Sequence, residues 1–196
     1  MIRRSARNYQ SAWQELAGRT GLTFTPAGCL GLYGGERVHG LYRGRPVRLD
    51  ASGDSTVESL AEDTRIRVAV RNKGGAYFSL SPPMLPALAR RFPPKEQVLL
   101  GDAAFDQGFL LRGKPAEFVA GVLAPEDLRQ RLLHLRSGTG LILGAKDLFL
   151  QRHGLERDVD YLHFVLDLLC DLAERVEETP PSRAGSGGSH TAAMAT

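Results

Sequence analysis

The sequence predicts an α+β fold: an antiparallel sheet built from hairpins and covered by an N-terminal helix and a long C-terminal helix. Short stretches alternate apolar and polar residues between turn residues, and wide apolar stripes at helical spacing stand near both ends of residues 1–178. Successive strands lack the alternating helices that a parallel sheet needs, so we expect antiparallel pairing. We predict one domain over 1–178, with a junction near 82–98 left open, and a disordered tail over 179–196, which has no aromatic or branched aliphatic residue.

The N-terminal helix is predicted at residues 9–20. One helical face carries Tyr9, Trp13, Leu16 and Thr20, and Gly21 is a suitable C-terminal stop. Trp13 is expected to anchor this helix to the core. A short strand follows at 22–25. The glycine-rich residues 26–35 are expected to form an irregular loop, because a phosphate-binding loop would lead into a helix.

Two hairpins are predicted next. Residues 37–49 alternate on both sides of a turn at 43–45, and residues 64–81 do so around the turn 72–75. The polar residues 50–63 between them lack the glycine and glutamate of a calcium loop, so we expect a connection. A short helix is predicted over 84–92.

Six arginines in these hairpins are the candidate anion- or partner-binding residues: Arg43, Arg45, Arg48, Arg65, Arg67 and Arg71. Strict alternation in the second hairpin places its three arginines on the solvent face. If the two hairpins are neighbours, the six form one basic face. The alternative is a solvated face that protects a sheet edge.

Residues 98–113 are predicted to lie in the core as a strand, a tight bend and a second strand. The motif residues are Gly101, Asp102, Phe105, Asp106, Phe109 and Gly113. The two phenylalanines lie four apart, as on one helical face. Both aspartates are interpreted as caps of backbone N–H groups. Acid–base chemistry or metal binding by the carboxylate pair is the alternative.

This stretch resembles a group of uncharacterised bacterial domains with the pattern Gly-Asp-x-x-Phe-Asp-x-x-Phe-x-x-(Arg/Lys)-Gly. Arg112 fills the basic position, and Gly40-x-Tyr42-x-Gly44-x-x-Val47 is similar to a hairpin of the same group. The resemblance covers residues 13–136 and implies no chemistry, because the group has no assigned activity. Many of its members carry transmembrane helices near the N-terminus, a pattern from which this chain departs.

The remaining residues predict helices at 115–123 and 125–135 and a closing hairpin at 141–150. A long helix follows at 156–178. Its apolar stripe suits packing on a sheet, and its opposite side is acidic. Pairing of part of this helix with another copy in a homodimer is left open.

Charge and composition exclude several classes. The net charge is +3, but residues 1–20 alone contribute +3 and Arg183 adds one, which leaves the body between them near −1. Nucleic acid is therefore not an expected partner, since a binding surface for it makes the folded body basic. Without an apolar run of membrane-spanning length or a signal-peptide core, we expect a cytoplasmic protein with reduced Cys29 and Cys170. Peripheral association with a membrane stays open.

No catalytic, metal-binding or cofactor-binding motif is found in the sequence. The function hypothesis is a non-catalytic protein-interaction or scaffold module that presents an arginine-bearing sheet face to a protein partner, with neither metal nor cofactor. Two alternatives remain: an enzyme that acts on a small anionic substrate, and a weak binder of nucleic acid or anionic surfaces.

Overall fold

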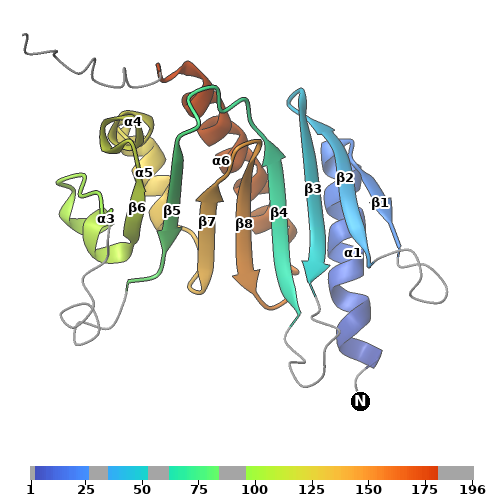
Figure 1. The fold of residues 1–196 in the computed structure, drawn as a ribbon. Coiled ribbons are helices and arrows are strands. Elements are labelled where there is room, and N and C mark those ends of the chain that lie inside the picture. The colour runs from blue at the N-terminus through green and yellow to red at the C-terminus, as the bar shows by residue number, and fades with distance from the viewer. Residues whose placement is uncertain (1–2, 27–34, 53–61, 84–95, 181–196) are drawn as a thin grey trace, which may run out of the picture.

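The eight strands of the described residues form one sheet, in which every pairing between strands is antiparallel. The computed structural model describes residues 3–26, 35–52, 62–83 and 96–180 (Figure 1). Across the sheet the strands follow the order β1-β2-β3-β4-β8-β7-β5-β6. Their bounds are β1 Thr23–Thr25, β2 Arg37–Tyr42, β3 Arg45–Ser52, β4 Asp63–Ala69, β5 Tyr77–Ser81, β6 Leu110–Lys114, β7 Thr139–Leu143 and β8 Asp147–His153.

Helices cover one face of this sheet, while the other face is turned toward the viewer in Figure 1. The helices are α1 Arg3–Thr20, α3 Ala103–Gly108, α4 Ala116–Val122, α5 Glu126–Leu133 and α6 Val159–Glu178. The N-terminal α1 lies behind β1 to β3, and α6 crosses behind the middle of the sheet. The predicted α+β fold, with an antiparallel sheet under N- and C-terminal helices, is confirmed.

The core lies between the sheet and these helices. Trp13 of α1 is fully buried, and α6 buries a wide stripe that includes Leu162, Leu166 and Leu169. Alternate residues of the strands supply the other side of the core, so the period of two along each strand decides which side chains it receives. Asp158 begins α6, because its carboxylate accepts a hydrogen bond from the backbone N–H of Tyr161.

The predicted hairpin over residues 64–81 is wrong. β4 and β5 are not neighbours, because the β7–β8 hairpin lies between them. Val70 N–H donates to the Lys146 carbonyl at 2.9 Å, and the Asn72 side-chain amide donates to the carbonyls of Ala76 and Gly144. The segment after β4 is thus fixed to the tip of the β7–β8 hairpin. By contrast, the predicted hairpins β2–β3 and β7–β8 are both confirmed.

The stretch 98–113 is buried only in part. Its first segment is no strand: an isolated bridge pairs the preceding Gln97 with Arg112, Val98 N–H donates to the Leu111 carbonyl at 3.0 Å, and Leu99 is 67% exposed. Phe105 is fully buried, and Phe109 packs on it with ring centroids 5.4 Å apart. The predicted loop at 26–35, connection at 50–63, short helix at 84–92 and C-terminal tail fall largely outside the described residues, as does Cys29.

Candidate functional site

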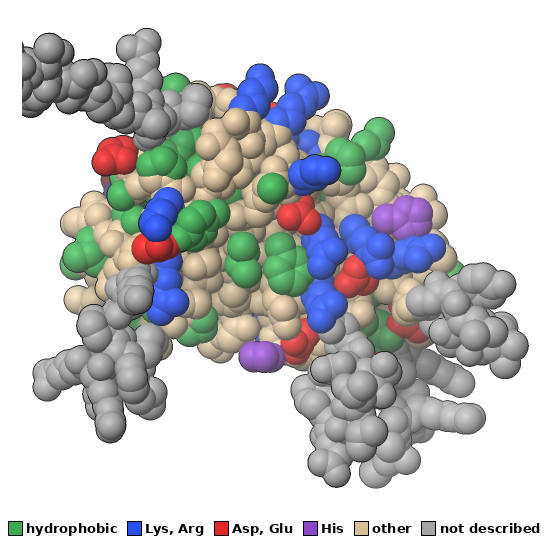
Figure 2. Space-filling view, in the orientation of Figure 1, with side chains coloured by type: hydrophobic (Ala, Val, Ile, Leu, Met, Phe, Trp, Pro, Cys, Tyr) green, Lys and Arg blue, Asp and Glu red, His purple; other side chains and the backbone are tan. Residues whose placement is uncertain are grey.

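The sheet face opposite the helices is the candidate site, and we call it the open face. One row of directly opposed side chains crosses it from β3 to β6: Arg48, Arg67, Phe149, Ile142, Ser79 and Arg112. An apolar pair therefore stands in the middle of the sheet with arginines on both sides. Figure 2 shows this arrangement as hydrophobic side chains near the centre with Lys and Arg side chains to either side.

The centre of the open face exposes apolar area. Ile142 on β7 is 47% exposed, and Tyr77 on the neighbouring β5 is 40% exposed. Phe149 is half-buried, with the Arg67 guanidinium 4.9 Å from its ring centroid. Single exposed apolar residues are ordinary, but a group of them on adjacent strands makes this face a candidate interaction surface.

A hollow of about 320 Å³ opens beside these side chains. It lies over β7, where Gly140 has no side chain and the paired strand β5 contributes the small Ser79 and Ser81. Other lining residues are Pro82, Gly138, Ile142, Phe149, Gln151 and His153. The larger side chains of Ile142, Phe149 and Gln151 thus border a gap left by Gly140 and the two serines of β5.

Arginines on β4 and β6 stand opposite residues that line this hollow. Arg65, Arg67 and Arg112 form no ion pair within the described residues, whereas Arg48 pairs with Asp50 at 2.6 Å. The buried Nε atoms of Arg65 and Arg112 also have no hydrogen-bond partner there. Unpaired guanidiniums are strong, directional donors for carboxylate groups.

Asp63 positions two of the side chains that line the hollow, Gln151 and His153. Asp63 accepts hydrogen bonds from Gln151 Nε2 at 2.6 Å and from His153 Nδ1 at 3.1 Å. Partial burial raises the pKa of Asp63, but the hydrogen bonds from Gln151, His153 and the Gly154 N–H, together with the charge of His153, bring the net pKa below its ordinary value. The carboxylate therefore stays ionised and fixes both side chains from β8.

The six predicted arginines are divided between two places. Arg48, Arg65 and Arg67 lie on the open face. Arg43 and Arg45, in contrast, pair with acidic residues of α6 on the helix-covered side: Arg43 with Asp171 at 2.6 Å, and Arg45 with Glu177 at 2.6 Å.

Arg71 lies beyond the end of β4, and its backbone N–H donates to Glu177. It lines a smaller hollow of about 250 Å³ together with Arg43 and Arg45. Because those two guanidiniums are already paired with carboxylates, the six arginines do not form one basic face.

The carboxylates of Asp102 and Asp106 are both used by the backbone. Asp102 accepts from Phe105 N–H at 3.2 Å and pairs with Arg129 at 2.8 Å. Asp106 accepts from the N–H groups of Leu100 and Gly101. The two aspartates therefore cap a bend, and they do not present a free carboxylate pair.

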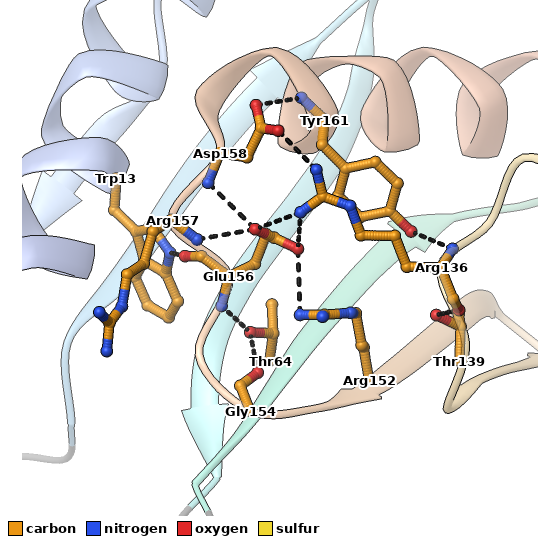
Figure 3. Close-up of polar contacts among 10 residues, drawn as sticks. All are labelled: Trp13, Thr64, Arg136, Thr139, Arg152, Gly154, Glu156, Arg157, Asp158 and Tyr161. Atoms are coloured by element: carbon orange, nitrogen blue, oxygen red, sulfur yellow. Dashed lines mark hydrogen bonds and ion pairs between the residues drawn. The ribbon is translucent and has the colours of Figure 1, made fainter.

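Glu156 is the most enclosed carboxylate with charged partners, and Figure 3 shows its surroundings. It pairs with Arg136 at 2.8 Å and Arg152 at 3.0 Å, and it accepts from the N–H groups of Arg157 and Asp158. All of these contacts fix the connection from β8 to α6. Among the described residues, no group of three or more His, Cys, Asp or Glu is placed to hold a metal ion.

Several residues of this site were not predicted from the sequence. Ile142 and Phe149 alternate with buried leucines, which was a usable signal for two outward apolar residues. Arg45 shares its strand phase with the buried Val47 and Leu49, which signalled a position on the core side. The role of Arg112 depends on strand order, which alternation does not give.

Comparisons with known proteins identify a fold but no family. No family model matches the chain, and no curated protein sequence matches it. Among solved structures, it is similar to the crystal structure of the mycobacterial trehalose monomycolate transport factor A, TtfA. The match has a TM-score of 0.58 and 11% sequence identity, and it covers 89% of this chain and 98% of that chain. No helix in the described part of the chain combines the length and apolarity needed to cross a membrane. At this identity, the likeness establishes a shared fold alone.

Proposed function

We propose that the protein is a non-catalytic binding module whose open face contacts an acidic surface of a protein partner. One observation carries the proposal: the exposed Ile142 and the half-buried Phe149 stand between Arg67 and Arg112, which form no ion pair within the described residues. Apolar area combined with arginine is typical of the energetic centre of protein interfaces.

The engagement of the carboxylates supports a binding role. Glu156, Asp102 and Asp106 bind arginines or backbone N–H groups that hold the fold. The buried Glu36 accepts hydrogen bonds from the Tyr9 hydroxyl and the Gln10 side-chain amide, which join it to α1. The solved structure with the same fold is of a transport factor, a role that is in keeping with binding. Its name says nothing of this chain's partner.

A site-specific crosslink in native cells tests the proposal. A photoreactive amino acid is placed at Ile142 and, as a control, at Leu99, which is also exposed but lies outside the open-face row. We expect a discrete protein adduct from position 142 and none from position 99. Arg67→Glu or Arg112→Glu should lower the adduct yield about tenfold.

A charge-matched control separates the face from total charge. Arg19→Glu makes the same charge change on α1, where Arg19 pairs with Glu15 and Asp160, and it should leave the adduct unchanged. Equal adducts from positions 142 and 99, or none from either, would contradict the proposal.

A further inference from the structure

We propose that the hollow over β7 is an anchor pocket, which takes one aromatic or large aliphatic side chain from an acidic segment of the partner. This inference rests on the proposed function and adds the chemistry of the partner. The partner feature that the open face recognises is a bulky apolar residue flanked by Asp or Glu.

Small residues on adjacent strands create the hollow. Side chains on one sheet face normally stand at every second residue of each strand, and they fill the surface. Here Gly140 has none, while Ser79 and Ser81 of the paired β5 are short. Ile142 and Phe149 stand as apolar walls beside the gap.

The fold itself does not require glycine at position 140. A Cβ built there meets only the Leu80 carbonyl oxygen, at 3.9 Å, and its φ lies outside the left-handed region. Gly113 is the contrast, since a Cβ there would lie 2.5 Å from the Tyr77 carbonyl oxygen. The consequence of Gly140 is therefore the space above it.

The size of the hollow favours one side chain as its occupant. About 320 Å³ lies at the lower end of the range for ligand pockets, which is roughly 300–1,000 Å³. The hollow is lined by side chains of the open face, so a segment lying on that face can insert a residue. Interface anchors of this kind are enriched in Trp and Tyr.

Charge complementarity makes the flanking residues of that segment acidic. Arg65 is opposite Gln151, Arg67 is opposite Phe149 and Arg112 is opposite Ser79, so all three neighbour lining residues. None of the three forms an ion pair in the part of the chain that is described. A carboxylate on either side of the anchor residue can accept two hydrogen bonds from one of these guanidiniums.

A nucleic-acid strand also carries negative charge and flat rings, but the face suits it less. Asp50, Asp63 and Asp147 stand on the same face as the arginines, and they would repel a continuous row of phosphates. Isolated carboxylates on a protein segment can avoid these three positions. We therefore assign the pocket to a protein segment and keep single-stranded DNA as an arm of the test.

A random dodecapeptide library displayed on phage provides the test. We expect the wild-type protein to enrich acidic peptides with an aromatic or large aliphatic residue at one position. Alanine at that position should weaken binding of the synthetic peptide about tenfold or more. Gly140→Leu, which fills the hollow, should cause a similar loss, and Ser81→Leu should do so from the opposite strand. Gly18→Leu, on the exposed side of α1 with open space around it, should cause none.

Three results would overturn the inference: no enrichment, enriched peptides without an anchor, or binding that survives both filling variants while their melting temperatures match wild type. Tighter, salt-dependent binding of oligo-dT than of the peptides would assign the face to nucleic acid instead. If the adduct at Ile142 persists in Gly140→Leu and requires Arg67, the proposed function stands and only the anchor pocket fails.

Discussion

The indole Nε1 of Trp13 donates a hydrogen bond to the backbone carbonyl of Glu156 at 3.1 Å, across 143 positions of the chain. At the same point the Glu156 side chain pairs with Arg136 and Arg152. The backbone N–H of Glu156 donates to Thr64 Oγ1 of β4 at 2.7 Å (Figure 3). The N-terminal helix, the central sheet and the start of α6 therefore meet at one residue.

Trp13 is predicted to contribute both burial and a hydrogen bond. Trp13→Ala should lower the free energy of unfolding by about 3–5 kcal/mol, since it leaves a cavity. Trp13→Phe should cost about 1–3 kcal/mol, because the Glu156 carbonyl loses its indole donor. Urea denaturation measures both. Leu99→Ala, at an exposed position, is the control and should stay within about 0.5 kcal/mol; an equal loss in the control and in Trp13→Ala would refute the prediction.

Glu156→Gln should destabilise the fold by about 1–3 kcal/mol, because its buried carboxylate loses two guanidinium partners that are themselves partly exposed. The change keeps the size of the side chain, so the loss reports charge and hydrogen bonding and not packing. Glu15→Gln, which breaks an exposed pair with Arg19, should cost at most about 0.5 kcal/mol. Equal effects of the two variants in urea denaturation would show that the Glu156 cluster does not stabilise the fold.

Gly113→Ala is expected to destabilise by about 1–3 kcal/mol or more, since its Cβ would lie 2.5 Å from the Tyr77 carbonyl oxygen and 2.8 Å from Val119 Cγ2. This close approach lets α4 pack on β6. Gly140→Ala, on the opposite face of the sheet with no such contact, is the matched control and should be close to neutral. A comparison of melting temperatures checks the pair, and an unchanged Gly113→Ala would rule out the packing argument.

Local patterns predicted the faces of strands, but not their neighbours. Ile66 and Val68 are buried and Arg65 and Arg67 point away, as alternation required. Yet the β7–β8 hairpin, from residues far along the chain, pairs with β4 in place of β5. Pairing between strands that are distant in sequence depends on how whole surfaces pack together. The periodicity of residues within one strand does not predict which strand lies beside it.

The candidate site depends on those long-range pairings, which explains why it was predicted only in part. Arg67 meets Phe149 only because β4 pairs with β8, and the hollow exists only because Gly140 lies beside β5. Arg65 and Arg67 were identified from the chain alone. Their apolar neighbours required the topology.

Cys170 is predicted to be unreactive in the folded protein. Its side chain is fully buried in α6, and burial raises the pKa of its thiol to about 11. Since the thiolate is the reactive form, alkylation by iodoacetamide at about pH 8 should be slow. A Cys29→Ser background isolates the signal in mass spectrometry. Rapid labelling without denaturant, at the rate seen in urea, would contradict the assigned burial.

The contacts between the β2–β3 turn and α6 should make stability depend on acid pH. The hydrogen bond from Arg45 holds the pKa of Glu177 below its ordinary value. Burial raises the pKa of Asp171, but hydrogen bonds and charge from Arg131 and Arg43 have the larger effect, so its net pKa is also lowered. Because the folded-state pKa values lie below those of the unfolded chain, about 4, the stabilisation is present above that pH. It is lost as the pH falls through the folded-state values.

Glu177→Gln should therefore reduce stability near neutral pH and flatten its decline below about pH 4, measured by urea denaturation across pH. Arg45→Gln should have a similar effect, and the double variant should cost less than the two single changes together, because both remove the same interaction. Additive losses, or an acid decline as steep as in the wild-type protein, would mean that this ion pair does not couple the hairpin to α6.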